Sequence, residues 1–280
     1  MANEHIFNGR KVVIATKHQK EQVIGPALQE AFGMEYIVSE KLDTDLLGTF
    51  TGEVERVLTP VEAARQKCIL ALSECDADFA IGSEGSFGPH PTLYFLPADE
   101  EILLLVDRKG ELEMVVKQVS LKTNYASFEQ GAEQSLADFL QQIKFPSHGV
   151  HVKSSATYVE KGIKSEDLLN QTIQEAVNRF GTYTLETDMR AMNNPTRMEV
   201  IEELAGKLVE KMKSCCPTCQ RPGFSPTDVI RGLVCSCCSL PTKSVKSLIY
   251  SCEGCHYTTY VDFPDSKTTE DPMFCDFCNP

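Results

Sequence analysis

The sequence lacks three features that would place it among membrane, secreted or nucleic-acid-coating proteins. No run of about 18 apolar residues occurs, which argues against a membrane-spanning helix. The N-terminus has no signal-peptide pattern, so we expect a cytoplasmic protein without a membrane partner. Basic residues are in the minority, because 27 Lys and Arg stand against 40 Asp and Glu, a net charge of -13. A protein that coats nucleic acid needs a basic face, which this composition does not favour.

Three common catalytic motifs are also absent. The sequence has no GxxxxGK[ST] segment, which excludes an ordinary P-loop nucleoside triphosphatase. It has neither the GxSxG segment of serine hydrolases nor the HExxH segment of zinc proteases. Any catalytic site must therefore be built from other residues.

Cysteine is distributed very unevenly along the 280 residues. Ten of the twelve cysteines lie from Cys215 onward. The charge changes at the same place, because the residues from Lys211 onward carry seven charges of each sign and the acidic excess lies before them. Both shifts predict a domain boundary, with an acidic domain at residues 1–212 and a small cysteine-rich domain at residues 213–280.

The first domain is predicted to be α/β, a mixed sheet flanked by helices. Short apolar runs predict buried strands at residues 11–16, 35–39 and 79–81. Two further strands at 101–107 and 112–120, joined by a short turn at residues 108–111, predict a hairpin. Thr59, Pro60 and Glu62 form the capping box of a helix start. Further helices are expected over residues 135–143, from Ser165 to Phe180, and from Asn194 to Met212.

The segment from Gly82 to Pro91 is the first candidate site. It is expected to leave the central strand as a glycine-rich loop, at the edge where open α/β sheets bind ligands. A turn that only reverses the chain is the alternative. The polar residues in this segment that we expect to contact a ligand are Ser83, Glu84, Ser86 and His90.

A polar, basic turn after the first predicted strand is expected to face that segment. Such a turn directs backbone N–H groups and cations at an anion, although a solvated helix cap would have the same composition. Its candidate phosphate-binding residues are Thr16, Lys17, His18 and Lys20.

Two other polar segments carry candidate residues. Asp43 and Asp45 are spaced to share a hard cation such as Mg²⁺, with Arg56 nearby, although a solvated surface loop has the same composition. Later in the chain, Asp188, Arg190 and Arg197 surround a predicted helix start. A positive charge at Arg197 opposes the helix dipole there unless an anion lies close by.

The order of these motifs resembles the inosine/xanthosine triphosphate pyrophosphatases over residues 11–88. The shared features are the Ala15-Thr16 turn, a helix with Glu62 and Lys67, and the Ser83-Glu84-Gly85 segment. The resemblance implies that Thr16 and Lys20 contact phosphate, that carboxylates hold Mg²⁺ and that pyrophosphate is released. This sequence departs from the family pattern in three places: Lys20 comes one residue early, Ala63 replaces an asparagine, and the strand-end segment reads Ser-Glu-Gly. The whole chain resembles an uncharacterised bacterial family of unknown function, which implies no activity.

These observations predict an Mg²⁺-dependent hydrolase of a nucleoside triphosphate or related phosphate compound. In this interpretation Glu84, with Asp43 or Asp45, supplies the metal ligands and the base. The alternative is a non-catalytic module that senses a nucleotide or another anion, with basic groups but without converging carboxylates.

Four Cys-x-x-Cys pairs mark the C-terminal domain as a double zinc ribbon. Four thiolates complete a tetrahedron around zinc, so eight ligands predict two closed, structural ions rather than a catalytic one. Disulfides are the less favoured alternative. The sequence leaves open whether neighbouring or alternate pairs share an ion. The neutral charge of the ribbon favours a protein or RNA partner over tight DNA binding. The eight ligands are Cys216, Cys219, Cys235, Cys238, Cys252, Cys255, Cys275 and Cys278.

Overall fold

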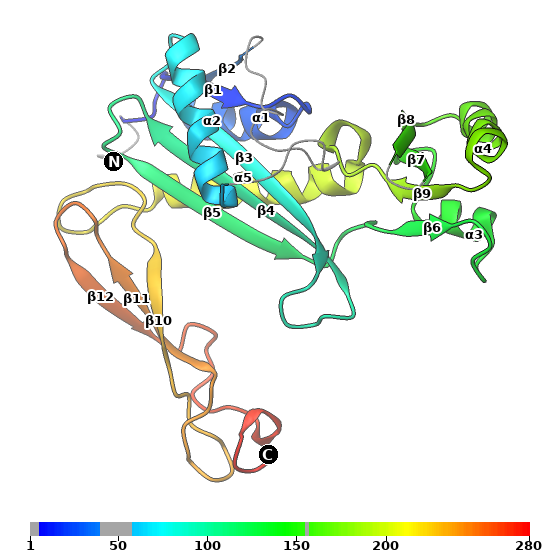
Figure 1. The fold of residues 1–280 in the computed structure, drawn as a ribbon. Helices are drawn as coiled ribbons and strands as arrows, with labels where there is room; N and C mark the ends of the chain where they lie inside the picture. The colour runs from blue at the N-terminus through cyan, green and yellow to red at the C-terminus, as the bar shows by residue number, and fades with distance from the viewer. Residues whose placement is uncertain (1–5, 40–57, 155–156) are drawn as a thin grey trace. The chain divides into compact units, whose positions relative to one another are not determined.

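The structure is a computed structural model that describes residues 6–39, 58–154 and 157–280. Over these residues the chain forms two units, Phe7–Val209 and Glu210–Pro280 (Figure 1). The predicted fold class is confirmed, because the model is mixed α/β with helix-flanked sheets and its C-terminal part carries two four-cysteine groups. No helix within the described ranges combines the length and the apolar character needed to cross a bilayer.

A five-stranded mixed sheet forms the centre of the larger unit. Its strand order is β2 (Glu35–Val38), β1 (Lys11–Ala15), β3 (Phe79–Pro89), β4 (Pro97–Asp107) and β5 (Glu113–Ser120). β1 runs parallel to both of its neighbours, whereas β3, β4 and β5 form an antiparallel meander. The apolar run in β1 is buried from Val12 to Ala15, as expected for a parallel strand covered on both faces.

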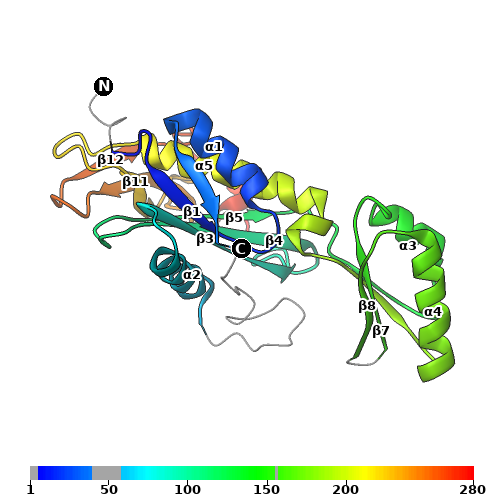
Figure 2. The ribbon, with the colours of Figure 1, turned by 90° about the horizontal axis from the view of Figure 1, so that it is seen from above.

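Helices cover both faces of this sheet. Figure 2 shows α1 (Glu21–Phe32) and α5 (Pro195–Lys213) on one face and α2 (Pro60–Glu74) on the other. The predicted capping box of α2 is present, because the Thr59 hydroxyl accepts from the Glu62 N–H and the Glu62 carboxylate accepts from the Thr59 N–H. Ala64, Cys68 and Ala71 of α2 pack into the sheet core.

The expectation of a glycine-rich loop at Gly82–Pro91 is wrong. β3 continues without a break to Pro89 and pairs residue by residue with β4. Gly82 lies so close to α2 that a Cβ atom there would overlap the carbonyl oxygen of Ala64. This glycine therefore allows a close approach of helix and sheet and does not serve a turn.

A second, antiparallel sheet completes the larger unit. Its order is β6 (Ser127–Glu129), β9 (Thr184–Thr187), β7 (Val150–Ser154) and β8 (Thr157–Ile163). The helices α3 (Leu136–Gln142) and α4 (Glu166–Phe180) pack on it around a separate core that includes Phe128, Phe139 and Leu185. A short 3-10 helix, η2 (Ala191–Asn193), leads from this sheet into α5.

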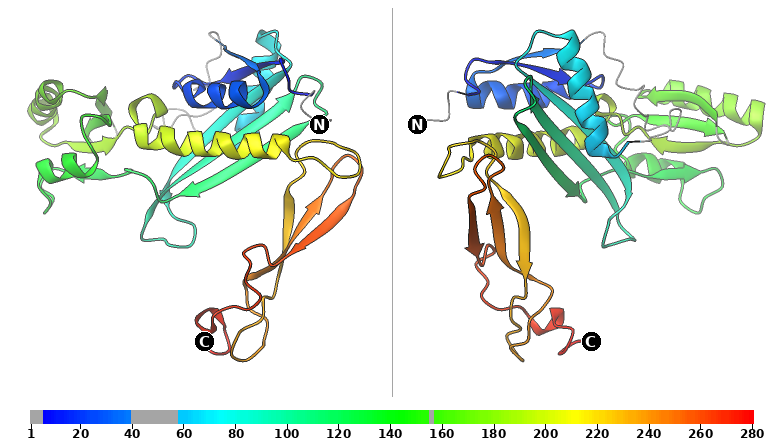
Figure 3. Two further views of the ribbon diagram at one scale, coloured as in Figure 1. Left: turned by 180° about the vertical axis from the view of Figure 1, so that it is seen from behind. Right: turned by 60° about the vertical axis from the view of Figure 1, so that its left-hand side comes forward.

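The smaller unit is built on a three-stranded antiparallel ribbon. Its strands are β10 (Pro226–Arg231), β11 (Val245–Ser251) and β12 (Thr258–Asp262), with β11 in the middle (Figure 3). A short 3-10 helix, η3 (Pro272–Phe274), precedes the last cysteine pair. Every residue of β10 is exposed, so the ribbon has little apolar core of its own.

Two glycines of β3 provide a matched test of the helix–sheet contact. We expect Gly82→Ala to lower the free energy of unfolding by about 1–3 kcal/mol or more, because the added methyl group meets rigid backbone. Gly88→Ala lies in the same strand with no atom within 4 Å of the new Cβ, and should change stability by less than about 0.5 kcal/mol. Urea unfolding of both variants measures the difference, and equal effects would contradict the close contact.

Candidate metal centres and a buried charge cluster

The eight predicted ligand cysteines gather into two groups of four. Within each group all sulfur atoms lie within 4.8 Å of one another. Alternate pairs share a group, so the simpler pairing of sequence neighbours is wrong and the interleaved alternative is confirmed. The first group is Cys216, Cys219, Cys252 and Cys255, and the second is Cys235, Cys238, Cys275 and Cys278.

Strand direction explains the interleaving. The first cysteine pair precedes β10 and the second follows it. β11 runs antiparallel to β10, so its end, followed by Cys252, lies beside the start of β10. β12 returns in the opposite direction and brings the fourth pair to the second. The two groups therefore lie at opposite ends of the ribbon.

The sulfur geometry fits zinc. Four thiolates at about 2.3 Å from a tetrahedral ion are about 3.8 Å apart. The Cys216–Cys255 and Cys219–Cys252 sulfur distances are 3.6 and 3.5 Å. The two groups could thus hold two zinc ions.

In the second group, the Cys235–Cys278 and Cys238–Cys275 sulfur distances are 3.9 and 3.6 Å. Cys215 and Cys237 belong to neither group.

The larger unit contains a cluster of charged side chains and one hydroxyl, all withdrawn from water, which we call the buried charge cluster. It lies where β1 ends and β3 continues. Each member is less than 9% exposed, and the members are Lys20, Lys67, Ser83, Glu84, Asp99, Glu101 and Arg197.

Lys20 brings the basic turn to β3. β1 ends where Ala15 pairs with Gly82, so the chain leaves the sheet beside Ser83. Lys20 is the N-cap residue of α1, and its ammonium donates to the Ser83 hydroxyl at 3.0 Å. Burial, and then the charge of Arg197, lowers the pKa of Lys20 to about 7. A buried, weakly basic lysine therefore lies against a serine.

Side chains of β3 alternate between the two faces of the sheet. Glu84 points to the α2 face, where Lys67 lies 2.5 Å from its carboxylate and 3.5 Å from the Ser83 carbonyl oxygen. Ser83 and Gly85 point to the opposite face, covered by α1 and α5. The cluster thus reaches both faces through one strand.

Arg197 enters the cluster from the first turn of α5. Its guanidinium donates to Glu101 at 2.5 Å and to the Met189 carbonyl oxygen, and it lies over the ring of Phe87. Glu101 is the anion that the arginine at this helix start requires. A Cβ at Gly85 would overlap both members of this pair, so the second glycine of β3 leaves room for it.

Asp99 is the most unusual member of the cluster. It is fully buried two residues before Glu101 on β4, and neither of its oxygens receives a hydrogen bond from a described residue. Burial, and then the negative charge of Glu101, raises the pKa of Asp99 to about 8. In its protonated form the Asp99 carboxyl can donate a hydrogen bond, which the ionised form cannot.

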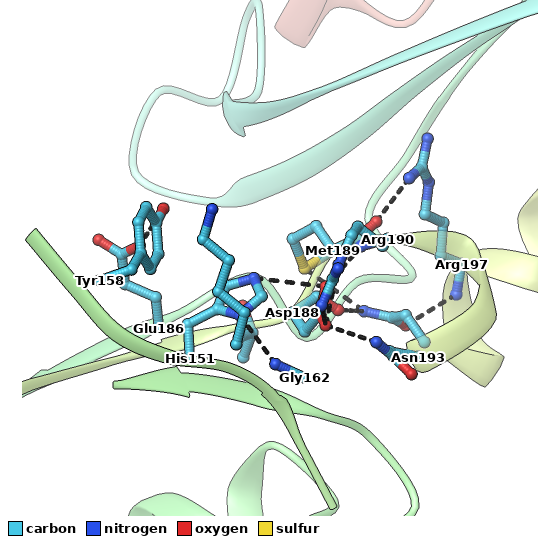
Figure 4. Close-up of polar contacts among 12 residues, drawn as sticks. His151, Tyr158, Gly162, Glu186, Asp188, Met189, Arg190, Asn193 and Arg197 are labelled. Atoms are coloured by element: carbon cyan, nitrogen blue, oxygen red, sulfur yellow. Dashed lines mark hydrogen bonds and ion pairs between the residues drawn. The ribbon is translucent and has the colours of Figure 1, made fainter. Parts of the chain in front are cut away.

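Asp188 organises a second polar group, shown in Figure 4, on the antiparallel sheet. Its carboxylate accepts from Arg190 at 2.7 Å and from Asn193 at 2.7 Å, and His151 Nε2 lies 3.4 Å away. The Gly162 N–H donates to His151 Nδ1, which places the ring proton on Nε2, facing Asp188. Burial opposes ionisation of Asp188, but the bonds from His151 and Arg190 hold its pKa well below the usual range.

The remaining predicted residues lie in several places. Thr16 is buried and accepts from the His18 N–H, while Lys17 is exposed in the same turn. Ser86 lies on β3, three residues beyond Ser83. Predictions that involve Asp43, Asp45 and Arg56 concern positions outside the described residues.

His90 lies at the hairpin tip, where its Nδ1 accepts from the N–H groups of Thr92 and Leu93. It follows Ser83 by seven residues, about 23 Å along a strand. The structure therefore does not bring His90 to the buried charge cluster.

Sequence reasoning missed Asp99 and Glu101 as site residues, and it missed His151. The only signal for the two carboxyls was the change from acidic to apolar residues at the start of a predicted strand. That change is equally typical of a strand that emerges from solvent. His151 stood between two valines with no partner apparent in the sequence.

Metal stoichiometry tests the pairing of the cysteines. We expect the wild-type chain to bind two zinc ions, and Cys219→Ser with Cys252→Ser to lose one ion because both residues belong to one group. Cys219→Ser with Cys238→Ser should lose both ions, because these residues belong to different groups although their Cys-x-x-Cys pairs follow one another in the sequence. Cys215→Ser is the control and should retain two. Native mass spectrometry counts the ions, and loss of a single ion in the second double variant would contradict the interleaving.

The pH dependence of stability tests the state of Asp99. Its folded pKa of about 8 exceeds the ordinary 3.8, so its contribution to the free energy of unfolding is complete below about pH 4 and is lost as the pH rises through 8. We expect the wild type to lose a few kcal/mol relative to Asp99→Asn over this window. Lys20 acts oppositely, since its lowered pKa makes stability rise between about pH 7 and 10.5.

Urea unfolding of the wild type and of Asp99→Asn from about pH 5 to pH 8 measures this difference. Parallel curves for the two proteins would show that Asp99 is ionised in the fold.

Comparisons with known proteins give one result at the level of the family. A model of a domain of unknown function, DUF6671, matches residues 67–280, which include all of β3–β5, the second sheet and the ribbon. No curated protein and no solved structure matches the chain. The resemblance to the inosine/xanthosine triphosphate pyrophosphatases is not supported by these comparisons. By its match over three quarters of its length, the chain belongs to the DUF6671 family.

Proposed function

We propose that the larger unit binds and hydrolyses a nucleoside triphosphate or a related phosphate compound, while the ribbon is held together by two zinc ions. The observation that carries this proposal is the gathering of three cations around Ser83 and Glu84 at the carboxyl end of β1. Open α/β sheets bind ligands at that edge. The three cations are Lys20, Lys67 and Arg197.

The chemistry of the cluster supports phosphoryl transfer. The reaction needs fixed cations to stabilise charge on the phosphoryl oxygens and a carboxylate or hydroxyl to position or supply the nucleophile. Lys67 and Arg197 supply cations on opposite faces of β3. Glu84 is a carboxylate of β3 near the end of β1, and Lys67, 2.5 Å away, holds it in position.

The described carboxylates do not by themselves fit Mg²⁺. Glu84 and Glu101 each face a cation, and within the described ranges only the cysteine groups bring three metal ligands together. The Mg²⁺ part of the prediction depends on Asp43 and Asp45, and no step of the proposed reaction is assigned to it here.

The pairing of charges favours one alternative function. Because Glu84 and Glu101 already neutralise two of the three cations, the cluster could bind an anion without turnover. In this alternative the larger unit is a sensor and the ribbon contacts a protein or RNA. Exposed apolar side chains near the second cysteine group, those of Met273, Phe274 and Phe277, favour a protein.

A nucleotide panel separates the two functions. We expect the zinc-loaded chain to release pyrophosphate or phosphate from at least one nucleoside triphosphate, measured with and without Mg²⁺. Glu84→Gln should lower the rate about 100-fold or more, as expected when a carboxylate that helps to position the reacting groups is removed. Glu175→Gln, an exposed change on α4, is the matched control and should retain the wild-type rate.

Binding of a nucleotide without release of product by the wild type would favour the sensor. Turnover that survives Glu84→Gln would remove Glu84 from the mechanism.

A further inference from the structure

Ser83 and Lys20 have the arrangement of a nucleophile and its base. The Lys20 nitrogen lies 3.0 Å from the Ser83 hydroxyl oxygen, and both side chains are buried. The residues are 63 positions apart, and the contact is produced by the parallel register of β1 and β3. A nucleophile within hydrogen-bond distance of a base that is itself held in place is the usual structure of an activated hydroxyl.

We propose that Ser83 and Lys20 form a serine–lysine dyad in which the Ser83 hydroxyl attacks the phosphorus atom of the substrate. This inference deepens the proposed function and rests on it. It assigns a covalent phosphoseryl intermediate where that function alone would allow direct attack by water.

The surroundings of Lys20 suit the role of a base. A lysine accepts a proton only when its amine is neutral, and burial together with Arg197 favours the neutral form. Glu101, 4.0 Å away, works in the other direction and also fixes the position of the amine. Lys67 and Glu84 act on the amine with opposite signs, so their effects partly cancel.

Ser83 is held in place by the sheet and not by a flexible loop. It lies inside β3, where its backbone pairs with Leu103 of β4. The glycines on either side at positions 82 and 85 are fixed by contacts with α2 and with the Arg197–Glu101 pair. The hydroxyl therefore has a defined direction toward Lys20, which favours attack along one path.

The reaction balances in two steps. In the first, the Ser83 proton moves to the neutral Lys20 amine, the bond from Oγ to the α-phosphorus forms and the bond to the pyrophosphate oxygen breaks, with the Lys20 proton passing to the leaving group. In the second, Lys20 takes a proton from water, the water oxygen attacks phosphorus, and the Oγ–phosphorus bond breaks as Ser83 recovers its proton. The products are a nucleoside monophosphate and pyrophosphate.

Labelling with a small fluorophosphonate tests the dyad without relying on turnover. The full zinc-loaded chain is incubated with the probe, and intact and peptide mass spectrometry locate the adduct. We expect one adduct, on Ser83, formed at a rate that rises with pH through about 7 and then levels off as Lys20 becomes neutral. Ser83→Ala should abolish it, whereas Ser73→Ala, an exposed serine on α2, should leave it unchanged.

Variants of Lys20 test the base. Lys20→Met should slow labelling at least tenfold and remove the rise near pH 7, while Lys117→Met, an exposed change on β5, should alter neither. Lys20→Arg retains the cation but cannot act as a base, so it should also slow labelling at least tenfold and remove the rise near pH 7. This variant keeps the test valid if Lys20→Met fails to fold. No adduct on Ser83 in the wild type, or unchanged labelling in Lys20→Arg, would overturn the dyad.

Failure of the dyad and failure of the proposed function give different results. Nucleotide hydrolysis that persists in Ser83→Ala overturns the dyad but leaves the hydrolase. Labelling of Ser83 without hydrolysis of any nucleotide leaves the dyad but removes nucleoside triphosphates as its substrates.

Discussion

The ion pair between Arg197 and Glu101 is the interaction on which the polar interior of the larger unit depends. Both side chains are almost completely withdrawn from water, so removal of either partner would leave a buried charge without compensation. The pair joins the first turn of α5 to the middle of β4 and requires a glycine at position 85 of β3. It also influences its neighbours, because Glu101 raises the pKa of Asp99 and Arg197 lowers that of Lys20.

This coupling explains how several charges coexist in one interior. With Asp99 protonated, Glu84 and Glu101 offset Lys67 and Arg197, and the charge of the cluster is set by Lys20. A proton can therefore be gained or lost near neutral pH at two sites, Asp99 and Lys20, without breaking either strong ion pair. Groups whose surroundings shift their pKa values toward neutrality are typical of functional sites, although structural ion networks also shift them.

The sequence predicted those features that depend on neighbouring residues. The capping box at Thr59, the hairpin of β4 and β5, and the Asn194 cap at the start of α5 all depend on local spacing, and all are present. The prediction of a loop at Gly82 was wrong because, in the sequence, a glycine that allows a turn cannot be distinguished from one that allows close packing. The difference is made by Ala64 and Arg197, which are distant in sequence. Asp99 and Glu101 were missed for the same reason, since their burial depends on a helix that begins almost 100 residues later.

In the ribbon, strand direction decides which Cys-x-x-Cys pairs share an ion, a choice that the spacing of the cysteines in the sequence leaves open. The Cys-x-x-Cys spacing fixed the ligands and their number, because two intervening residues suffice to direct both sulfurs at one ion. Spacing could not say which pairs meet, since that choice depends on the order and direction of β10, β11 and β12. With β11 in the middle and antiparallel to both neighbours, alternate pairs must meet at opposite ends. The register of β1 and β3 likewise places Lys20 against Ser83, so in both units long-range strand pairing converts polar residues into a site.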